Sequence, residues 1–273
     1  GEIFEAGVVP REVILANEAF QPEMRGVAPP GGVWSHITGV DLVRCGPDDI
    51  YVLEDNCRTP SGISYVLETR EVMSRMFPAL FADGSIRPVD GYAEMLVEAI
   101  AEVAPPACEG APRMAFLTPG YFNSAYYEHS FLADQMGIDL VEGRDLFARD
   151  GRLWQRTIRG ADRVDILYRR IDDAFLDPLA FRPDSLLGVP GLMEIYREGG
   201  VTLVNAPGTG VADDKSVYPY VPEMIRFYLG EEAILPNVPT WRCSEPDACA
   251  HVFAHLDELV VKEVHGSGGY GMI

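Results

Sequence analysis

An alternation of strand-like and helix-like segments between residues 113 and 205 is the feature that most constrains this fold. Residues 124–136 are typical of a helix, and short apolar runs of strand length lie on both sides of it. These strand-like runs are 113–117, 138–141, 164–168 and 201–205. Strands that alternate with helices form mainly parallel sheets. We therefore predict an α/β (α+β) fold with a parallel sheet in this region.

Two hairpins are predicted beside the parallel sheet. Asp150-Gly151 lies between two short apolar runs and is the strongest short hairpin signal in the chain. Nearer the N-terminus, 35–44 and 50–56 have strand patterns, and the turn 45–49 joins them. The second of these strands begins as an apolar run, which predicts a buried strand.

The remaining segments suggest three successive parts. The proline-rich stretch 105–112 is the clearest boundary, and we expect parts at 1–110, 111–210 and 211–273. Further helices are predicted at 11–20, 64–76, 91–103 and from 213 to about 229. A last strand is predicted at 259–262.

Composition excludes several classes of protein. The formal net charge of -20 argues against non-specific nucleic-acid binding and against anionic membrane surfaces, because both require clustered Lys and Arg. No apolar run reaches the length of a membrane span, and we expect no basic-then-apolar leader. The five cysteines are dispersed without CxxC spacing, which is typical of a reducing compartment and gives no zinc site. We expect a cytoplasmic protein.

A cluster of polar side chains ends the predicted strand 50–56. Alternate residues of a strand share a face, so Glu54 and Asn56 project together and Asp55 points away. Asp41 is on the preceding strand and could face the same site. Two hard oxygen donors at this spacing suit Mg²⁺, which leaves its other positions to waters and phosphates. A solvated strand end is the alternative interpretation.

Candidate substrate-binding groups follow this strand and another one. Arg58, Thr59 and Ser61 lie on the turn after the strand and could hold an anionic or peptide-like substrate. Residues 165–173 carry two arginines at a strand's end, where ligands bind in open α/β sheets. A planar guanidinium suits carboxylate recognition, and we predict Arg170 as the catalytic one. Ion pairs with neighbouring acids explain these arginines equally well.

A glycine-rich stretch near the end of the sequence is a candidate phosphate cradle. Lys262 is followed by Gly266, Ser267, Gly268 and Gly269. Glycines let backbone N–H groups approach an anion closely, and the ammonium adds a point charge. The stretch is not a Walker A loop, because no Gly-Lys-Ser/Thr follows the glycines. A glycine-rich surface turn is the alternative.

The order of these motifs resembles the circularly permuted ATP-grasp family, relatives of glutathionylspermidine synthase. The motifs, in chain order, are 54–62, 168–173, 205–208 with Asp214-Lys215, and Lys262 with its glycine-rich loop. The resemblance implies that Glu54 and Asn56 hold Mg²⁺, with Asp41 as a third ligand. In ordinary ATP-grasp enzymes the phosphate-covering loop precedes the metal-binding acids, so the order found here is the permuted one.

The resemblance also implies how ATP and substrate bind. It implies that Lys215 and Lys262 contact ATP, that the glycine-rich loop covers its phosphates, and that Thr59 and Ser61 lie near a peptide substrate. Arg58 stands where the synthase motif has an acid, so glutathione and spermidine are not predicted as substrates.

The three expected parts take their roles from this resemblance. Residues 1–110 would be the metal-binding part, 111–210 a pre-ATP-grasp-like region with the parallel sheet, and 211–273 the start of the nucleotide-covering subdomain. The adenine-binding and remaining metal-binding elements of the family would follow the glycine-rich loop. We therefore expect a truncated chain that is inactive by itself.

The function implied is that of an ATP-dependent carboxylate–amine ligase acting through an acyl phosphate. Its cofactors would be ATP and Mg²⁺, and its partners a small-molecule or peptide carboxylate and an amine. Such chemistry needs positioned cations more than protein acids and bases. A non-catalytic nucleotide-binding or scaffold module is the alternative, and a kinase-like phosphotransferase is a third. The presence of both the acid-amide motif and the lysine with its glycines favours the enzyme.

Overall fold

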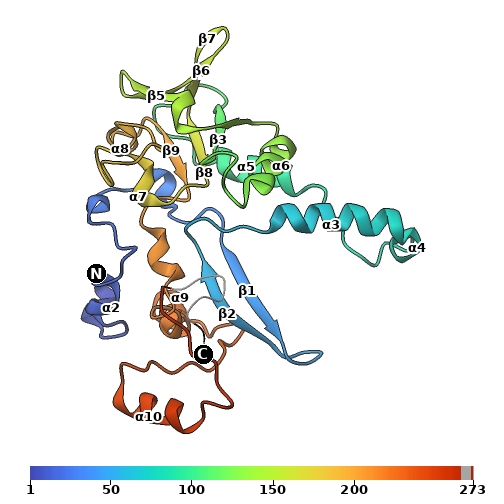
Figure 1. Cartoon of the computed structure of the whole chain (residues 1–273), viewed down its shortest axis with the longest axis vertical. Coiled ribbons are helices and arrows are strands. Elements are labelled where there is room, and N and C mark those ends of the chain that lie inside the picture. Colours follow the sequence, from blue (N-terminus) through green and yellow to red (C-terminus); the bar gives the residue numbers. More distant parts are fainter. Residues whose placement is uncertain (266–271, 273) are drawn as a thin grey trace. The chain divides into compact units, whose positions relative to one another are not determined.

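The computed structural model describes residues 1–265 and residue 272, and it divides the chain into two compact units. Unit 1 comprises Gly1–Pro22, Thr38–Arg58 and Gly208–Ile273, and unit 2 comprises Glu23–Ile37 and Thr59–Pro207. Figure 1 draws the helices and strands of both units. Each unit is therefore built from segments that are far apart in the sequence. The three parts expected from the sequence stay a prediction.

A four-stranded parallel sheet forms the centre of unit 2. Its strands, in spatial order, are β4 (Asp139–Val141), β3 (Met114–Leu117), β8 (Ile166–Arg169) and β9 (Thr202–Val204). Every pair of neighbours in this sheet runs parallel. The predicted parallel sheet in a mixed α/β chain is confirmed.

The two faces of this sheet pack into different hydrophobic clusters. Phe116 joins a cluster with helices α5 (Tyr92–Ala101) and α6 (Tyr126–Met136). Its neighbour Leu117 joins the other cluster, which includes helix α8 (Leu192–Arg197). This separation follows from the alternation of side chains along a strand. In Figure 1, α5 and α6 lie on one side of the parallel strands and α8 on the other.

Unit 2 also contains a three-stranded antiparallel sheet. Its strands, in order, are β5 (Leu146–Arg149), β6 (Arg152–Thr157) and β7 (Gly160–Val164). The β5–β6 turn is Asp150-Gly151, with φ of 53° and 66°. Two successive positive φ values are typical of a two-residue type I′ turn, which matches the twist of the strands. The predicted hairpin is confirmed.

The strand predicted at 164–168 is present as β8, with shifted ends, because two strands meet at Asp165. Strand β7 ends one residue before it and β8 begins one residue after it. The carboxylate of Asp165 is fully buried; Oδ2 accepts a hydrogen bond from the Arg113 N–H (2.9 Å), and Oδ1 lies 2.8 Å from the Arg163 Nε. These contacts hold Asp165 in place at the point where the chain passes from the antiparallel sheet to the parallel sheet.

The remaining helices of unit 2 are short, apart from α3. They are η2 (Pro30–Gly32), α3 (Ile63–Met76), α4 (Pro78–Phe81), η3 (Gly143–Asp145) and α7 (Asp173–Leu176). A further short helix, η1 (Pro22–Met24), spans the boundary of the two units in the sequence. The helices predicted at 64–76, 91–103 and 124–136 are confirmed as α3, α5 and α6, with small shifts at their ends.

The hairpin predicted near the N-terminus is the sheet of unit 1. Strand β1 (Gly39–Arg44) pairs antiparallel with β2 (Ile50–Asn56). On its other edge β2 is hydrogen-bonded at Val52, whose N–H donates to the Pro236 carbonyl and whose carbonyl accepts from the Val238 N–H. A buried strand was predicted here, but every residue of β2 is only half-buried, so this prediction overestimated the burial of the strand. The reason is that a two-stranded sheet covers its strands incompletely.

The helices of unit 1 correct two predictions. They are α1 (Glu2–Glu5), α2 (Arg11–Leu15), η4 (Thr209–Asp213), η5 (Tyr218–Tyr220), α9 (Val221–Leu229) and α10 (Pro246–Ala254). The helix predicted from 213 begins at Val221, with Pro222 in its first turn, where proline is favoured. Helix α2 ends earlier than predicted, and the Asn17 side chain accepts the Ala19 N–H (2.8 Å) in a turn just beyond it.

The strand predicted at 259–262 is wrong. This segment is irregular, and no strand of the described residues runs beside it to supply the hydrogen bonds of a ladder. Within residues 1–265, no helix combines the length and the apolar character that crossing a bilayer requires.

Candidate functional site

Two carboxylates and a lysine of unit 1 meet near the end of the β1–β2 hairpin. Asp41 lies opposite Glu54 in the antiparallel register. Lys215 reaches Glu54 from the turn that follows η4, with Nζ 3.3 Å from Oε2. The side chains of this ion pair are 23% and 25% exposed, so they are shielded from solvent but still accessible. The structure thus brings together three of the residues predicted to bind metal and ATP.

The surroundings of Asp41 show that this group of residues is electrostatically coupled. Partial burial raises the pKa of Asp41, and the charge of Glu54 and a hydrogen bond with Glu54 raise it further. The charges of Lys262 and Lys215 act in the opposite direction. Two neighbouring acids compete for ionisation, and a bound cation would remove that competition. Lys262, although its predicted strand is absent, therefore acts on the carboxylate of Asp41.

Asp55 belongs to different surroundings, as the alternation of the strand predicts. Burial raises the pKa of Asp55, and the charge of Asp55 contributes, after burial, to the raised pKa of Tyr218. The Tyr218 hydroxyl donates to the Val52 carbonyl and accepts from the Val238 N–H (2.8 Å). Asp55 thus lies near a tyrosine that supports the edge of β2.

The donor set at the hairpin end fits a hard divalent cation. Asp41 and Glu54 offer carboxylate oxygens, and Asn56, two residues from Glu54 on the same strand, offers an amide oxygen. Across the described residues, no group of three or more His, Cys, Asp or Glu is placed to hold a metal ion. Mg²⁺ needs only one or two protein carboxylates when waters and phosphates complete its shell. The roles of Asp41, Glu54 and Asn56 as ligands stay a prediction.

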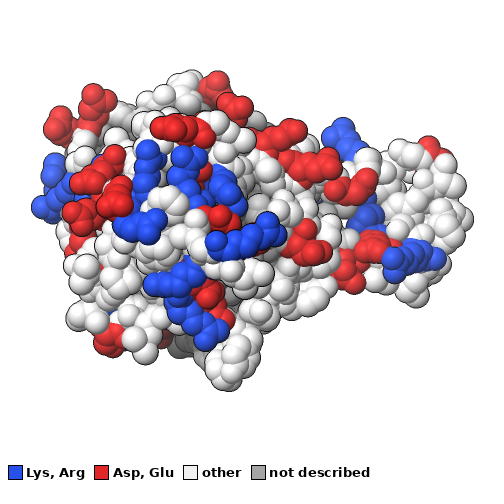
Figure 2. All heavy atoms as spheres, turned by 90° about the horizontal axis from the view of Figure 1, so that it is seen from above, with Lys and Arg blue, Asp and Glu red and all other residues white. Residues whose placement is uncertain are grey.

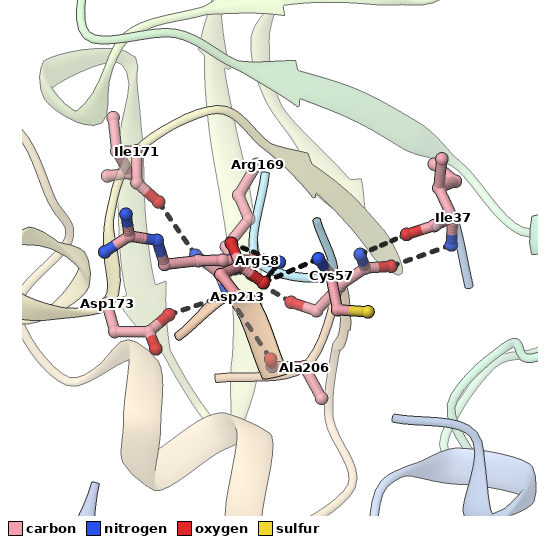
Figure 3. A network of polar contacts seen from close by, with 9 residues as sticks. Ile37, Cys57, Arg58, Arg169, Ile171, Asp173, Ala206 and Asp213 are labelled. Carbon is pink, nitrogen blue, oxygen red and sulfur yellow. Dashed lines mark hydrogen bonds and ion pairs between the residues drawn. The ribbon is translucent and has the colours of Figure 1, made fainter. Parts of the chain in front are cut away.

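Asp213 fixes the end of the strand that carries the candidate ligands. Its Oδ1 accepts hydrogen bonds from the backbone N–H groups of Cys57 (2.6 Å) and Arg58 (3.1 Å). Figure 3 shows these bonds meeting at one carboxylate. The same loop comes close to Arg58 at Gly210, where an added Cβ would lie 2.9 Å from the Arg58 Cδ. The Arg58 backbone is therefore part of a fixed turn in unit 1.

Asp214 connects the segments of the two predicted ATP-binding lysines. Its Oδ1 accepts the Ser216 N–H (2.7 Å), and its Oδ2 lies 2.6 Å from the Nδ1 of His265. The Lys215 N–H donates to the Val264 carbonyl (3.1 Å). The turn that carries Lys215 is thus bonded to the segment that follows Lys262. The predicted phosphate-binding residues Gly266, Ser267, Gly268 and Gly269 lie outside the described residues.

Arg170 of unit 2 is buried against the turn that carries the other predicted substrate residues. Its guanidinium donates to the carbonyls of Thr59 (3.2 Å) and Pro60, and it lies 3.2 Å from the Oε1 of Glu128. The Oε2 of Glu128 accepts the Gly62 N–H (2.6 Å). Ser61 lies in this turn and is exposed. The catalytic role of Arg170 stays a prediction, and the structure gives it a clear part in holding this turn.

The neighbouring Arg169 has a different environment. It is fully buried and donates to the carbonyls of Asn205 (2.8 Å), Ile171 (2.8 Å) and Ala206 (3.3 Å). Its guanidinium also lies 2.7 Å from the carboxylate of Asp173 (Figure 3). These contacts join the ends of β8 and β9, so Arg169 stabilises this edge of the parallel sheet.

Asp213 and Glu128 make several of these contacts, but the sequence did not predict a role for either in the candidate site. Each accepts hydrogen bonds from backbone N–H groups that are distant in the sequence. Asp213 stands beside the Asp214-Lys215 motif, and this adjacency was the available signal. Glu128 lies within a helix, where nothing in the sequence distinguishes it from a surface acid.

Comparison with known proteins gives relatives over nearly the whole chain. An uncharacterized protein of Synechocystis is 57% identical over 271 residues, which are 99% of this chain and 56% of that protein. An uncharacterized protein of Mycobacterium tuberculosis is 52% identical over 272 residues, or 100% of this chain and 49% of the relative. A protein of Frankia alni named "Putative glutamate--cysteine ligase 2-3" is 43% identical over 98% of this chain and 31% of its own length.

The chain thus spans about half the length, or less, of these curated relatives. A family model described as "A circularly permuted ATPgrasp" matches residues 1–273. Membership of an ATP-grasp family implies ATP binding. This chain belongs to the circularly permuted ATP-grasp family.

Proposed function

We propose that this chain is the metal- and phosphate-binding part of an ATP-dependent ligase that joins a carboxylate to an amine. The observation that carries the proposal is the Asp41–Glu54 carboxylate pair with Lys215 beside it, in a chain of the circularly permuted ATP-grasp family. The name of the Frankia alni relative, a putative glutamate–cysteine ligase, supports an amide-forming reaction between two amino acids.

In the proposed reaction, ATP transfers its γ-phosphoryl group to the substrate carboxylate, giving an acyl phosphate and ADP. The amine then attacks the acyl carbon, and phosphate leaves as the C–N bond forms and the amine loses a proton. Mg²⁺, when bound, neutralises charge on the phosphate oxygens. Lys215 and Lys262 would add positive charge at the same phosphates, which is where phosphoryl transfer needs stabilisation.

The roles of the other groups follow from their contacts. Asp41, Glu54 and Asn56 would hold Mg²⁺, and Asp213 would keep their strand end in place through its backbone hydrogen bonds. In unit 2, Arg170 would keep Thr59 and Ser61 in position for the substrate through the carbonyls of their turn. The pre-ATP-grasp-like assignment of 111–210 belongs to this same proposal.

A product search tests the proposal. The whole gene product is incubated with Mg·ATP, pooled amino acids and short peptides, and the mixture is searched by mass spectrometry for an amide that appears together with ADP and phosphate. The proposal predicts such a product, and it predicts its loss in Glu54→Gln. ATP binding without any amide, across acids and amines of all classes, would favour the nucleotide-binding module instead.

A further inference from the structure

The antiparallel sheet of unit 2 has one face rich in arginine. The register of the three strands places on this face the residues Phe147, Arg149, Arg152, Trp154, Arg156 and Arg163, which we call the arginine face. The opposite face carries Leu146, Leu153 and Val164, which are buried in the core. Figure 2 views the molecule from the end at which Figure 1 draws this sheet, and several Lys and Arg side chains lie close together there.

The charge of this region contrasts with that of the rest of the chain. Between residues 144 and 163 there are six arginines and three aspartates, whereas the whole chain has a formal net charge of -20. More than a quarter of the 22 Lys and Arg residues therefore belong to one short segment. Four of these six arginines lie on the arginine face, which therefore carries a local concentration of positive charge.

Aromatic rings hold two of these guanidinium groups in place. The Cζ of Arg149 lies 4.7 Å from the centre of the Trp154 ring, and the Cζ of Arg156 lies 4.8 Å from that of Phe147. A guanidinium stacked on a ring keeps its N–H edges available and loses less side-chain entropy on binding an anion. The guanidinium groups of Arg149 and Arg156 therefore each cover one face of an aromatic ring.

Two guanidinium groups of the arginine face, those of Arg152 and Arg156, donate to backbone carbonyls. Arg156 donates to the carbonyls of Arg144 (2.7 Å) and Leu146 (2.8 Å), and Arg152 donates to the Ala107 carbonyl. These acceptors are neutral, and each guanidinium has five N–H donors. Nearby acids also take part, because Arg149 lies 3.8 Å from the exposed Asp150 and Arg163 pairs with buried Asp165.

Two of the arginines also oppose each other across the sheet. Arg149 and Arg152 are directly paired in the β5–β6 register. Like charges at opposed positions destabilise a sheet. Carboxylates bound between the two side chains would relieve this repulsion, and a planar guanidinium accepts a carboxylate through two parallel hydrogen bonds.

We propose that the arginine face is a docking surface for a carboxylate-rich polypeptide segment. Charge complementarity supports a polyanion, and the state of the aromatic rings favours carboxylates over nucleic acid. The rings of Phe147 and Trp154 are stacked with Arg156 and Arg149, so bases would have to displace these groups in order to stack. This proposal does not rest on the proposed ligase function.

Fluorescence anisotropy with a labelled poly-glutamate peptide tests this proposal. The double variant Arg149→Gln with Arg156→Gln should bind the peptide about tenfold more weakly, or worse, because it loses two charge-assisted contacts. The same positions changed to Lys should recover only part of the affinity, since a lysine keeps the charge but not the paired hydrogen bonds. Circular dichroism and thermal unfolding verify that both variants are folded.

Arg182 provides a matched control. Its side chain is 52% exposed, as is that of Arg149, its Cζ lies 4.9 Å from the Phe175 ring, and it pairs with Asp184. Arg182→Gln should leave peptide affinity unchanged. The proposal is overturned if the folded double Gln variant binds the peptide as well as the parent does. It is also overturned if a single-stranded RNA of equal charge binds this face more tightly than the peptide.

Discussion

Arg170 and Glu128 form a buried ion pair in unit 2, with 3.2 Å between Nη2 and Oε1 and side chains only 6% and 3% exposed. Both partners also bond to the backbone of one turn. Arg170 donates to the carbonyls of Thr59 and Pro60, and Glu128 accepts the Gly62 N–H. The turn predicted to bind substrate is therefore held on both sides by a single pair of opposite charges.

Removing the charge of Glu128 should destabilise the protein strongly. Glu128→Gln leaves the Arg170 guanidinium buried without its counter-ion, so we expect the free energy of unfolding to fall by about 3–5 kcal/mol. Urea denaturation measures this. The exposed Glu98 of α5 is the control, because Glu98→Gln should change the free energy by no more than about 0.5 kcal/mol. Equal effects from both changes would show that the pair does not hold the turn.

His129 should make stability depend on pH. Burial, and then the charge of Arg170, lower the pKa of His129 from 6.5 to about 4, and its Nδ1 lies 2.9 Å from the Thr118 hydroxyl. His129 of the unfolded chain therefore binds a proton as the pH falls below 6.5. In the folded chain His129 stays neutral until the pH reaches about 4. The contribution of neutral His129 is present above 6.5 and is lost as the pH falls towards 4.

Urea unfolding at a series of pH values measures this effect. His129→Gln removes the titrating group, so its free energy of unfolding should fall less between pH 6.5 and 4 than that of the parent. A variant whose pH profile runs parallel to that of the parent would show that His129 does not titrate as we infer.

Asp213 should protect two backbone amides of the turn after β2. In Asp213→Ala the N–H groups of Cys57 and Arg58 lose their acceptor, which should cost about 1–3 kcal/mol. Hydrogen exchange followed by NMR should then show faster exchange at these two amides. Asp48→Ala, in the exposed β1–β2 turn, is the control and should leave both rates unchanged. Unchanged rates in Asp213→Ala would mean that the backbone of the turn is fixed by other contacts.

Sequence patterns correctly predicted the elements whose formation depends on residues that are close together in the chain. The β1–β2 hairpin, the Asp150-Gly151 turn and the helix at 64–76 follow from alternation, turn residues and helical composition, which act over short distances. The parallel sheet followed from the order of strands and helices, because crossovers require it.

Sequence patterns did not predict the features that depend on contacts between distant segments. Lys215 was expected to begin a helix, but it lies in a turn whose N–H bonds to the Val264 carbonyl and whose side chain pairs with Glu54. Asp213 and Glu128 bond to backbone groups 156 and 66 residues away, so their importance depends on the three-dimensional arrangement within each unit. The strand 259–262 failed because β-rich composition does not form a strand without a neighbouring strand.

The proposed reaction predicts that an acyl phosphate can be trapped. With Mg·ATP, the correct acid and hydroxylamine in place of the amine, a hydroxamate should form, because hydroxylamine attacks the activated carboxyl group. Mass spectrometry detects this product. Omitting ATP is the control and should give none. A phosphorylated or acylated form of the protein in its place would rule out the direct acyl-phosphate route.

Mg·ATP binding by variants of two neighbouring acids is the sharpest test of the proposed metal and phosphate site. Glu54 pairs with Lys215 and lies opposite Asp41, whereas Asp55 lies near Tyr218. Calorimetry with the whole gene product should therefore show that Glu54→Gln weakens Mg²⁺-dependent ATP binding by about tenfold or more, since a charged contact is lost. Asp55→Asn should leave this binding within about twofold, because Asp55 belongs to the other face of the strand. Equal losses in the two variants, or no loss in Glu54→Gln, would show that Glu54 does not hold Mg·ATP in the way we propose.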